Sequence, residues 1–76
     1  MTAMEAAAQS EVCAAFRLDE RGRWWLYVLP KHLLFRSVED TDQDIYEPAA
    51  VSEVARFTDW QPGYPPERKK VQYRTA

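Results

Sequence analysis

The stretch RWWLYVL, from Arg23 to Leu29, constrains the fold more than any other part of the chain. In an extended strand neighbouring side chains point to opposite faces, so this stretch presents large apolar groups on both sides. We therefore expect a central strand, with the core on one side and a helix, the tail or a partner protein on the other; if the chain leaves the second side uncovered, its aromatic residues form an exposed binding face. With 76 residues in all, we expect a single domain, because a second core would not exclude enough water.

Two further strands are expected beside this stretch. Residues 12–18 alternate between apolar and mixed positions, which is typical of a half-buried strand. The following Asp-Glu-Arg-Gly ends in Gly22, which can adopt positive φ, and predicts a tight hairpin turn. Pro30 lacks an amide donor and should end the central strand, after which residues 33–38 alternate again. The three strands predict an antiparallel meander.

A helix is expected over residues 48–57. Pro48 suits the first helical turn, and apolar residues then recur at spacings of three and four, which indicates one buried face. The preceding residues 39–47 contain five acids and no base, so we interpret them as a solvated loop. This helix is the expected cover for one face of the sheet.

Both ends of the chain leave two interpretations open. Thr2 and Glu5 form a capping-box pattern, which fits either a short docked helix or a frayed terminus, because one or two turns are marginal in water. Three prolines and a glycine in residues 59–66 argue against regular structure there. From residue 71 the sequence alternates again, so the basic tail is either an edge strand or disordered.

Together these patterns predict an α+β fold, with a small antiparallel sheet of three to four strands packed by one helix. Residues 1–10 would form an N-terminal arm or short helix, residues 11–60 the domain, and residues 61–76 a proline-rich linker followed by a basic tail or edge strand.

No pattern in the chain indicates catalysis or a cofactor. His32 is the only histidine and has no serine, cysteine or carboxylate beside it in its strand, and Cys13 has nothing nearby to activate its thiol. Only Gly22 and Gly63 are present, too few for a phosphate-binding loop. We expect a protein that is not an enzyme and has no catalytic residues and no cofactor.

The spacing of Asp40, Asp42 and Asp44 resembles the start of a calcium loop. Such a loop also needs glycine at its sixth position and glutamate at its twelfth, where this chain has Ile45 and Val51. We therefore expect no metal site.

The location of the protein follows from similar reasoning. The N-terminal residues lack the basic start and apolar run of a secretory signal, and no segment has the ~18 apolar residues of a membrane span. The single cysteine cannot form an internal disulfide and fits a reducing compartment. We expect a cytoplasmic protein that does not enter a membrane.

The aromatic residues exceed what one face of a small sheet can bury. Aromatic and arginine side chains dominate interface energetics, so we expect an intracellular regulator that binds and modulates a larger protein or complex, in the sense of inhibition. Proteins of this size and composition include phage or mobile-element products, which is an analogy of class only. A homodimer is also compatible. The predicted contact residues are Arg23, Trp25, Tyr27, Trp60 and Tyr64.

The alternative is an accessory protein that binds nucleic acid. The net charge of −2 argues against it, whereas residues 67–76 carry four bases and one acid. Its contact residues would be Arg21, Arg68, Lys69, Lys70 and Arg74. Arg17, Arg23 and Arg36 would extend this patch if the hairpin lies beside the tail.

Overall fold

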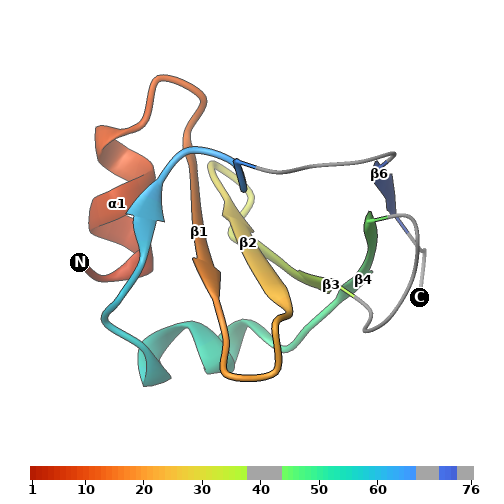
Figure 1. Cartoon of the computed structure of the whole chain (residues 1–76). Helices are drawn as coiled ribbons and strands as arrows, with labels where there is room; N and C mark the ends of the chain where they lie inside the picture. Colours follow the sequence, from red (N-terminus) through yellow and green to blue (C-terminus); the bar gives the residue numbers. More distant parts are fainter. Residues whose placement is uncertain (38–43, 67–70, 74–76) are drawn as a thin grey trace.

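Four strands pair in sequence order to form the centre of one sheet. In the computed structural model, which describes residues 1–37, 44–66 and 71–73, these are β1 (Ala14–Leu18), β2 (Trp24–Val28), β3 (Leu33–Ser37) and β4 (Asp44–Pro48) (Figure 1). Each pairs antiparallel with the next. The turn between β1 and β2 contains Gly22 at φ +75°, as the sequence predicts. The α+β fold with an antiparallel meander is confirmed.

Two short strands complete the sheet at its edges. The order is β5-β1-β2-β3-β4-β6, in which β5 (Gln61–Pro62) is antiparallel to β1 and β6 (Val71–Tyr73) is parallel to β4. The edge strand expected in the tail is present over β6. The prediction of no regular structure in residues 59–66 was wrong for β5. A proline is tolerated there because an edge strand needs ladder hydrogen bonds on one side only.

The N-terminal residues form a docked α-helix, α1 (Ala3–Gln9), so the first of the two interpretations is confirmed. The Thr2 hydroxyl accepts a hydrogen bond from the Glu5 amide at 3.2 Å, and the Glu5 carboxylate accepts one from the Thr2 amide at 3.0 Å. The helix faces the sheet with alanines that are fully buried, namely Ala3, Ala6 and Ala7. Their small side chains let the helix backbone lie close to β1 and β2.

Residues 48–57 do not form the predicted α-helix. Pro48 is the last residue of β4, and a 3₁₀-helix, η1 (Val51–Arg56), follows it. The apolar residues Val51, Val54 and Phe57 lie three apart, which is the period of a 3₁₀-helix as much as that of one α-helical face. Val54 and Phe57 pack at the margin of the core, so η1 is a partial cover and α1 is the main one.

The prediction of a solvated loop over residues 39–47 was also wrong in part. Its last four residues, Asp-Ile-Tyr-Glu at 44–47, belong to β4, which pairs with β3 from Tyr46 onward and buries Tyr46 in the core. The remainder of that segment, with Asp40 and Asp42, lies outside the described residues.

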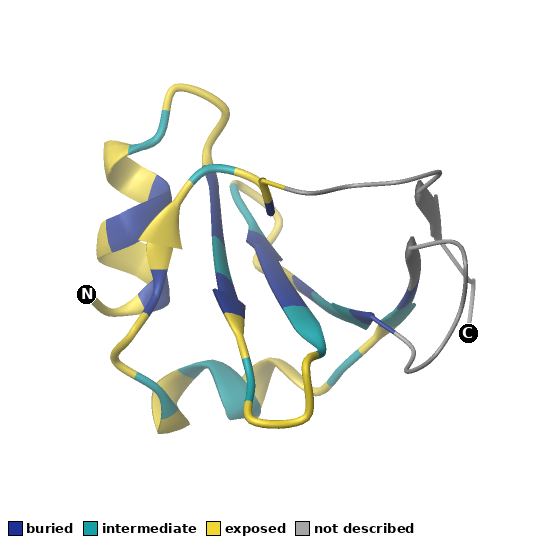
Figure 2. Cartoon of the chain, viewed as in Figure 1, coloured by how far each residue is buried: buried dark blue, intermediate teal, exposed yellow. Residues whose placement is uncertain are grey.

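The buried residues form two clusters, one on each face of the sheet, and Figure 2 shows buried positions in dark blue along α1, β1 and β2. On the face beneath α1, Trp25, Tyr27 and Leu34 pack with the α1 alanines and Trp60. On the opposite face, Leu26 packs with Ala14 and Tyr46, and partly buried aromatic residues border this second cluster. The central strand is therefore covered on both sides by the chain itself.

Among the described residues, no helix has the length and apolar character required to cross a bilayer.

Candidate functional site

A row of polar and aromatic side chains crosses three strands on the face that α1 and η1 cover. Strand register places Arg17 of β1 opposite Trp25 of β2, and Trp25 opposite Arg36 of β3. Directly paired residues project from the same face, so an indole lies between two guanidinium groups. The Arg36 guanidinium carbon lies 5.5 Å from the centre of the Trp25 ring.

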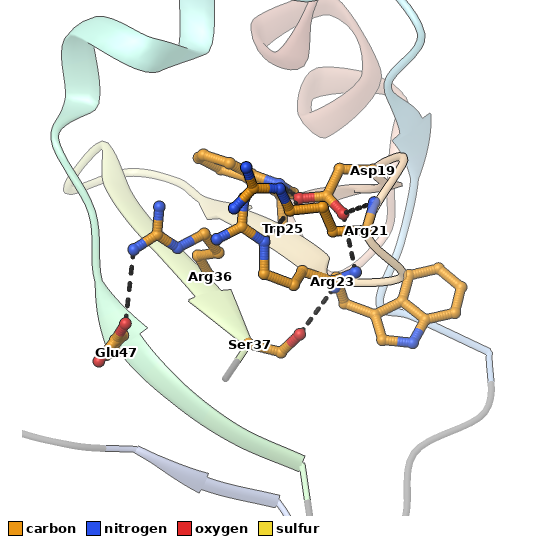
Figure 3. A network of polar contacts seen from close by, with 8 residues as sticks. Asp19, Arg21, Arg23, Trp25, Arg36, Ser37 and Glu47 are labelled. Carbon is orange, nitrogen blue, oxygen red and sulfur yellow. Dashed lines mark hydrogen bonds and ion pairs between the residues drawn. The ribbon is translucent and has the colours of Figure 1, made fainter. Parts of the chain in front are cut away.

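Asp19, in the turn between β1 and β2, holds this end of the sheet together (Figure 3). Its carboxylate accepts hydrogen bonds from the amides of Arg21 and Arg23 at 2.9 and 2.8 Å. It also accepts from Arg23 Nε and from the Trp25 indole Nε1, both at 2.9 Å. Burial raises the pKa of Asp19, but these hydrogen bonds, that from Trp25 first, outweigh burial and hold its pKa below the usual value.

Arg17 is a buried cation with a solvent-exposed counter-ion. Its side chain is 7% exposed and forms a two-pronged ion pair with Asp59, at 2.7 Å through Nε and 3.2 Å through Nη2. The hydrogen bond from Arg17 lowers the pKa of Asp59. The guanidinium carbon also lies 3.7 Å from the centre of the Phe57 ring. Arg17 Nη1 is shielded from solvent and has no hydrogen-bond partner in the part of the chain that the structure describes.

Five arginines surround one cavity of about 400 Å³, which we call the arginine pocket. Trp25 and Phe57 provide its aromatic surface, with ring centres 5.7 Å apart. Figure 3 shows that the side chains of Arg21, Arg23 and Arg36 gather beside Trp25 and Asp19. The lining arginines are Arg17, Arg21, Arg23, Arg36 and Arg56, and the lining acids are Asp19, Glu20 and Glu53.

A second cavity, of about 500 Å³, lies between α1 and η1, and we call it the apolar groove. Its exposed walls include Met4 and Val51, which are 54% and 48% exposed. In the same groove, buried Tyr27 and exposed His32 share a hydrogen bond between the phenol oxygen and Nδ1, and burial raises the pKa of Tyr27. Phe57 lines this groove as well as the arginine pocket, so η1 borders both cavities.

Three of the predicted contact residues do not lie on the surface. Trp25, Tyr27 and Trp60 are at most 4% exposed, so the expectation of an exposed aromatic sheet face was wrong. The physical reason is that α1 and the chain after η1 cover that face. Trp25 and Tyr27 still contribute to the two cavities, at the floor of the arginine pocket and of the apolar groove.

The other predicted contact residues are spread over the molecule. Arg23 lines the arginine pocket, whereas Tyr64 is 37% exposed in the segment after β5 and lines neither cavity. For the nucleic-acid alternative, Arg21 also lines the arginine pocket. The tail bases of that alternative lie outside the described residues, and they are Arg68, Lys69, Lys70 and Arg74.

Arg56 and Phe57 belong to the site but were not among the predicted contact residues, and Arg17 and Arg36 were named only as an extension of the basic patch in the nucleic-acid alternative. A usable signal was present for two of them. A hairpin turn centred on residues 19–23 sets Arg17 opposite Trp25, and the next turn sets Trp25 opposite Arg36. Register therefore brings these arginines together, whereas η1 adds Arg56 and Phe57 through tertiary packing.

The chemistry available at this site is recognition of an anion. Guanidinium groups donate several hydrogen bonds in one plane and carry a permanent charge. Among residues 1–37, 44–66 and 71–73, no three side chains of the metal-binding types gather closely enough to hold an ion. Compared with protein-family models, curated proteins and solved structures, the chain shows no match.

Proposed function

We propose that this chain is a small non-enzymatic protein that binds a larger protein and modulates it, through the surface on either side of η1. The observation that carries the proposal is that an arginine-lined pocket and an apolar groove share Phe57 and lie against the same short helix. A single partner segment can therefore contact both.

The composition of the two cavities supports protein recognition. The cores of protein interfaces are rich in aromatic residues, methionine and arginine. The groove offers Met4 and the pocket offers arginines supported by Trp25 and Phe57. The groove walls Met4 and Val51 are about half exposed, so a partner would remove apolar surface from water.

The arrangement of His32 is compatible with a non-enzymatic role. Its Nδ1 is engaged with the phenol of Tyr27, a group whose pKa is raised rather than lowered. Phenols with a raised pKa are poor nucleophiles at neutral pH.

The proposal is tested by capturing partners from cells of the source organism with paired variants. Val51→Glu places a charge in the apolar groove, and Val12→Glu makes the same change at a site of similar exposure, 50%, outside both cavities. We expect wild type and Val12→Glu to capture the same protein and Val51→Glu to lose it. Recovery of that protein by Val51→Glu at wild-type strength would contradict the proposal.

Modulation is then measured directly. The captured protein is purified, and its activity is assayed with increasing amounts of wild type or Val51→Glu. We expect a saturable change, in the direction of inhibition, with wild type only.

The second candidate function is nucleic-acid binding, which the convergence of five arginines on one pocket favours. Titration with single-stranded DNA and RNA at about 50 and 200 mM salt distinguishes the two candidates, because phosphate contacts produce a steep salt dependence. Tight, salt-sensitive binding that Arg21→Ala weakens would favour this second candidate.

A further inference from the structure

The arginine pocket carries a positive charge on an acidic protein. Its five lining arginines outnumber its three lining acids by two, whereas the whole chain has a net charge of −2; the further partners of Arg17 and Arg36, Asp59 and Glu47, lie outside the lining. Clefts that concentrate one sign of charge attract ligands of the opposite sign. The pocket is therefore suited to an anionic group.

Internal ion pairs leave part of this donor capacity unused. Arg17, Arg23 and Arg56 have close carboxylate partners, whereas Arg36 reaches Glu47 only at 3.4 Å. Within the described residues, no carboxylate lies within ion-pair distance of the Arg21 guanidinium. At least one lining cation is thus available to a ligand.

Two buried donors in the lining residues also lack acceptors. Arg17 Nη1 and Arg36 Nε are shielded from solvent and have no hydrogen-bond partner among residues 1–37, 44–66 and 71–73, and the Arg17 side chain is more than nine-tenths buried. A buried donor without an acceptor costs free energy, so native structures rarely leave one unpaired. Because neither atom is exposed to solvent, an oxygen ligand would reach them only after the arginine side chains move, but their positive charge still favours an anion in the pocket.

The acids of the pocket decide which anion fits. Asp19, Glu20 and Glu53 lie among the arginines and would repel the successive phosphates of a nucleic acid. A single carboxylate carries one negative charge, so these acids repel it less than they repel a chain of phosphates. Its two oxygens lie in one plane and match the donor geometry of a guanidinium group. A volume of about 400 Å³ accommodates one acidic side chain.

We infer that the arginine pocket binds one aspartate or glutamate side chain of the partner protein, beside an apolar residue that enters the groove. This inference rests on the proposed function and specifies the partner chemistry at the same surface. The acidic residue provides orientation and the apolar residue buries Met4 and Val51.

The test uses the full chain labelled with ¹⁵N and four probes. One is a flexible glycine-serine peptide with a single Glu-Leu pair, and its matched control replaces Glu with Gln. The others are inorganic phosphate and a ten-nucleotide single strand of thymidines. The measured signals are the Arg Nε–H resonances and the Trp25 indole N–H, which reports on the floor of the pocket.

We expect the Glu-Leu peptide to shift these resonances saturably and to bind at least tenfold more tightly than the Gln-Leu control. Arg21→Ala should weaken binding about three- to tenfold, whereas Lys31→Ala, an exposed base outside both cavities, should not. Equal binding of the Glu and Gln peptides, or saturable binding of phosphate or the oligonucleotide alone, overturns the inference.

Failure of the inference is distinguishable from failure of the proposed function. If Val51→Glu abolishes partner capture while the Glu-Leu peptide does not bind, the protein-binding function holds and the acidic-residue assignment falls. If Val51→Glu captures the partner normally, the function at this surface falls, whatever the peptide does.

Discussion

Replacing Asp19 by alanine should destabilise the fold more than any change at an exposed turn residue. The side chain is only 10% exposed, and its two oxygens accept four hydrogen bonds. One of the donors is the indole of Trp25, a residue that is only 4% exposed and therefore largely shielded from solvent. The substitution therefore leaves buried donors unpaired at the centre of the arginine pocket.

The expected loss follows from these contacts. A buried donor left without its acceptor costs about 1–3 kcal/mol, and each of the remaining bonds contributes about 0.5–1.5 kcal/mol. Allowing for partial solvent access of the turn amides, we expect Asp19→Ala to lower the free energy of unfolding by roughly 3–4 kcal/mol. A domain of this length has a total of about 4–11 kcal/mol, so a large part of its stability is at stake.

Asp19→Asn separates the two halves of the network. The amide oxygen can replace Oδ1, which serves the backbone amides, but the amide nitrogen cannot accept from Arg23 Nε and Trp25 Nε1 as Oδ2 does. We expect about half the loss seen for alanine. Glu20→Ala, the exposed neighbour, should change stability by no more than about 0.5 kcal/mol and serves as the control.

Urea unfolding at pH 7 and at pH 3 measures both the magnitude and its cause. Because the pKa of Asp19 is lowered in the folded state, its contribution is present above the unfolded pKa of about 3.9 and is lost as pH falls through the folded pKa. The difference between wild type and Asp19→Ala should therefore narrow on acidification. A loss below about 1 kcal/mol at pH 7, or an equal loss at both pH values, would refute this account.

Three further substitutions test other parts of the fold by the same unfolding measurement. Thr2→Ala removes the acceptor of the Glu5 amide and should cost about 1 kcal/mol, whereas Thr2→Ser should be nearly neutral; equal effects would exclude a role for the cap. Leu26→Ala, at a fully buried position, should cost about 2–5 kcal/mol, against less than about 1 for Leu18→Ala, which is 49% exposed; similar losses would contradict the second core cluster. Asp59→Asn should lower the free energy of unfolding by about 1 kcal/mol at pH 7, mainly because Arg17 stays buried without its counter-ion. Because the pKa of Asp59 is lowered in the folded state, this loss should disappear as the pH falls through that pKa. A loss of the same size at pH 3 would argue against the ion pair.

The meander was predictable because its signals are local. Alternation in residues 12–18 and 33–38, the turn ending at Gly22 and the proline after the central strand each act over a few residues, and β1, β2 and β3 lie within the predicted ranges. The capping box of α1 is local in the same way. In these places short-range preference and tertiary structure agree.

The remaining elements depend on contacts between distant segments. Residues 44–47 form a strand where β3 offers an edge, and β5 forms where β1 offers another. Apolar residues three apart do not distinguish η1 from an α-helix. The aromatic residues predicted as partner contacts are buried because α1 packs closely against the sheet. The alanines of α1 permit this close approach, but their pattern in the sequence does not indicate where the helix docks.

The site was only partly predictable for the same reason. Arg21, Arg23 and Trp25 were named, yet as members of two different hypotheses, and the structure places them around one cavity. Strand register adds Arg17 and Arg36. Arg56 and Phe57 come from η1 and the residue after it, where the sequence pattern does not distinguish a 3₁₀-helix from an α-helix.

The strand order also has a consequence for the sequence of events in folding. Strands β1 to β4 meet their chain neighbours, so those pairings require the closure of short loops only. By contrast, the packing of α1 against β5 joins residues more than fifty positions apart. We expect the β1–β2–β3 hairpins to be formed in the transition state and α1 to dock after it. Destabilising substitutions in α1 should then accelerate unfolding and leave the refolding rate nearly unchanged.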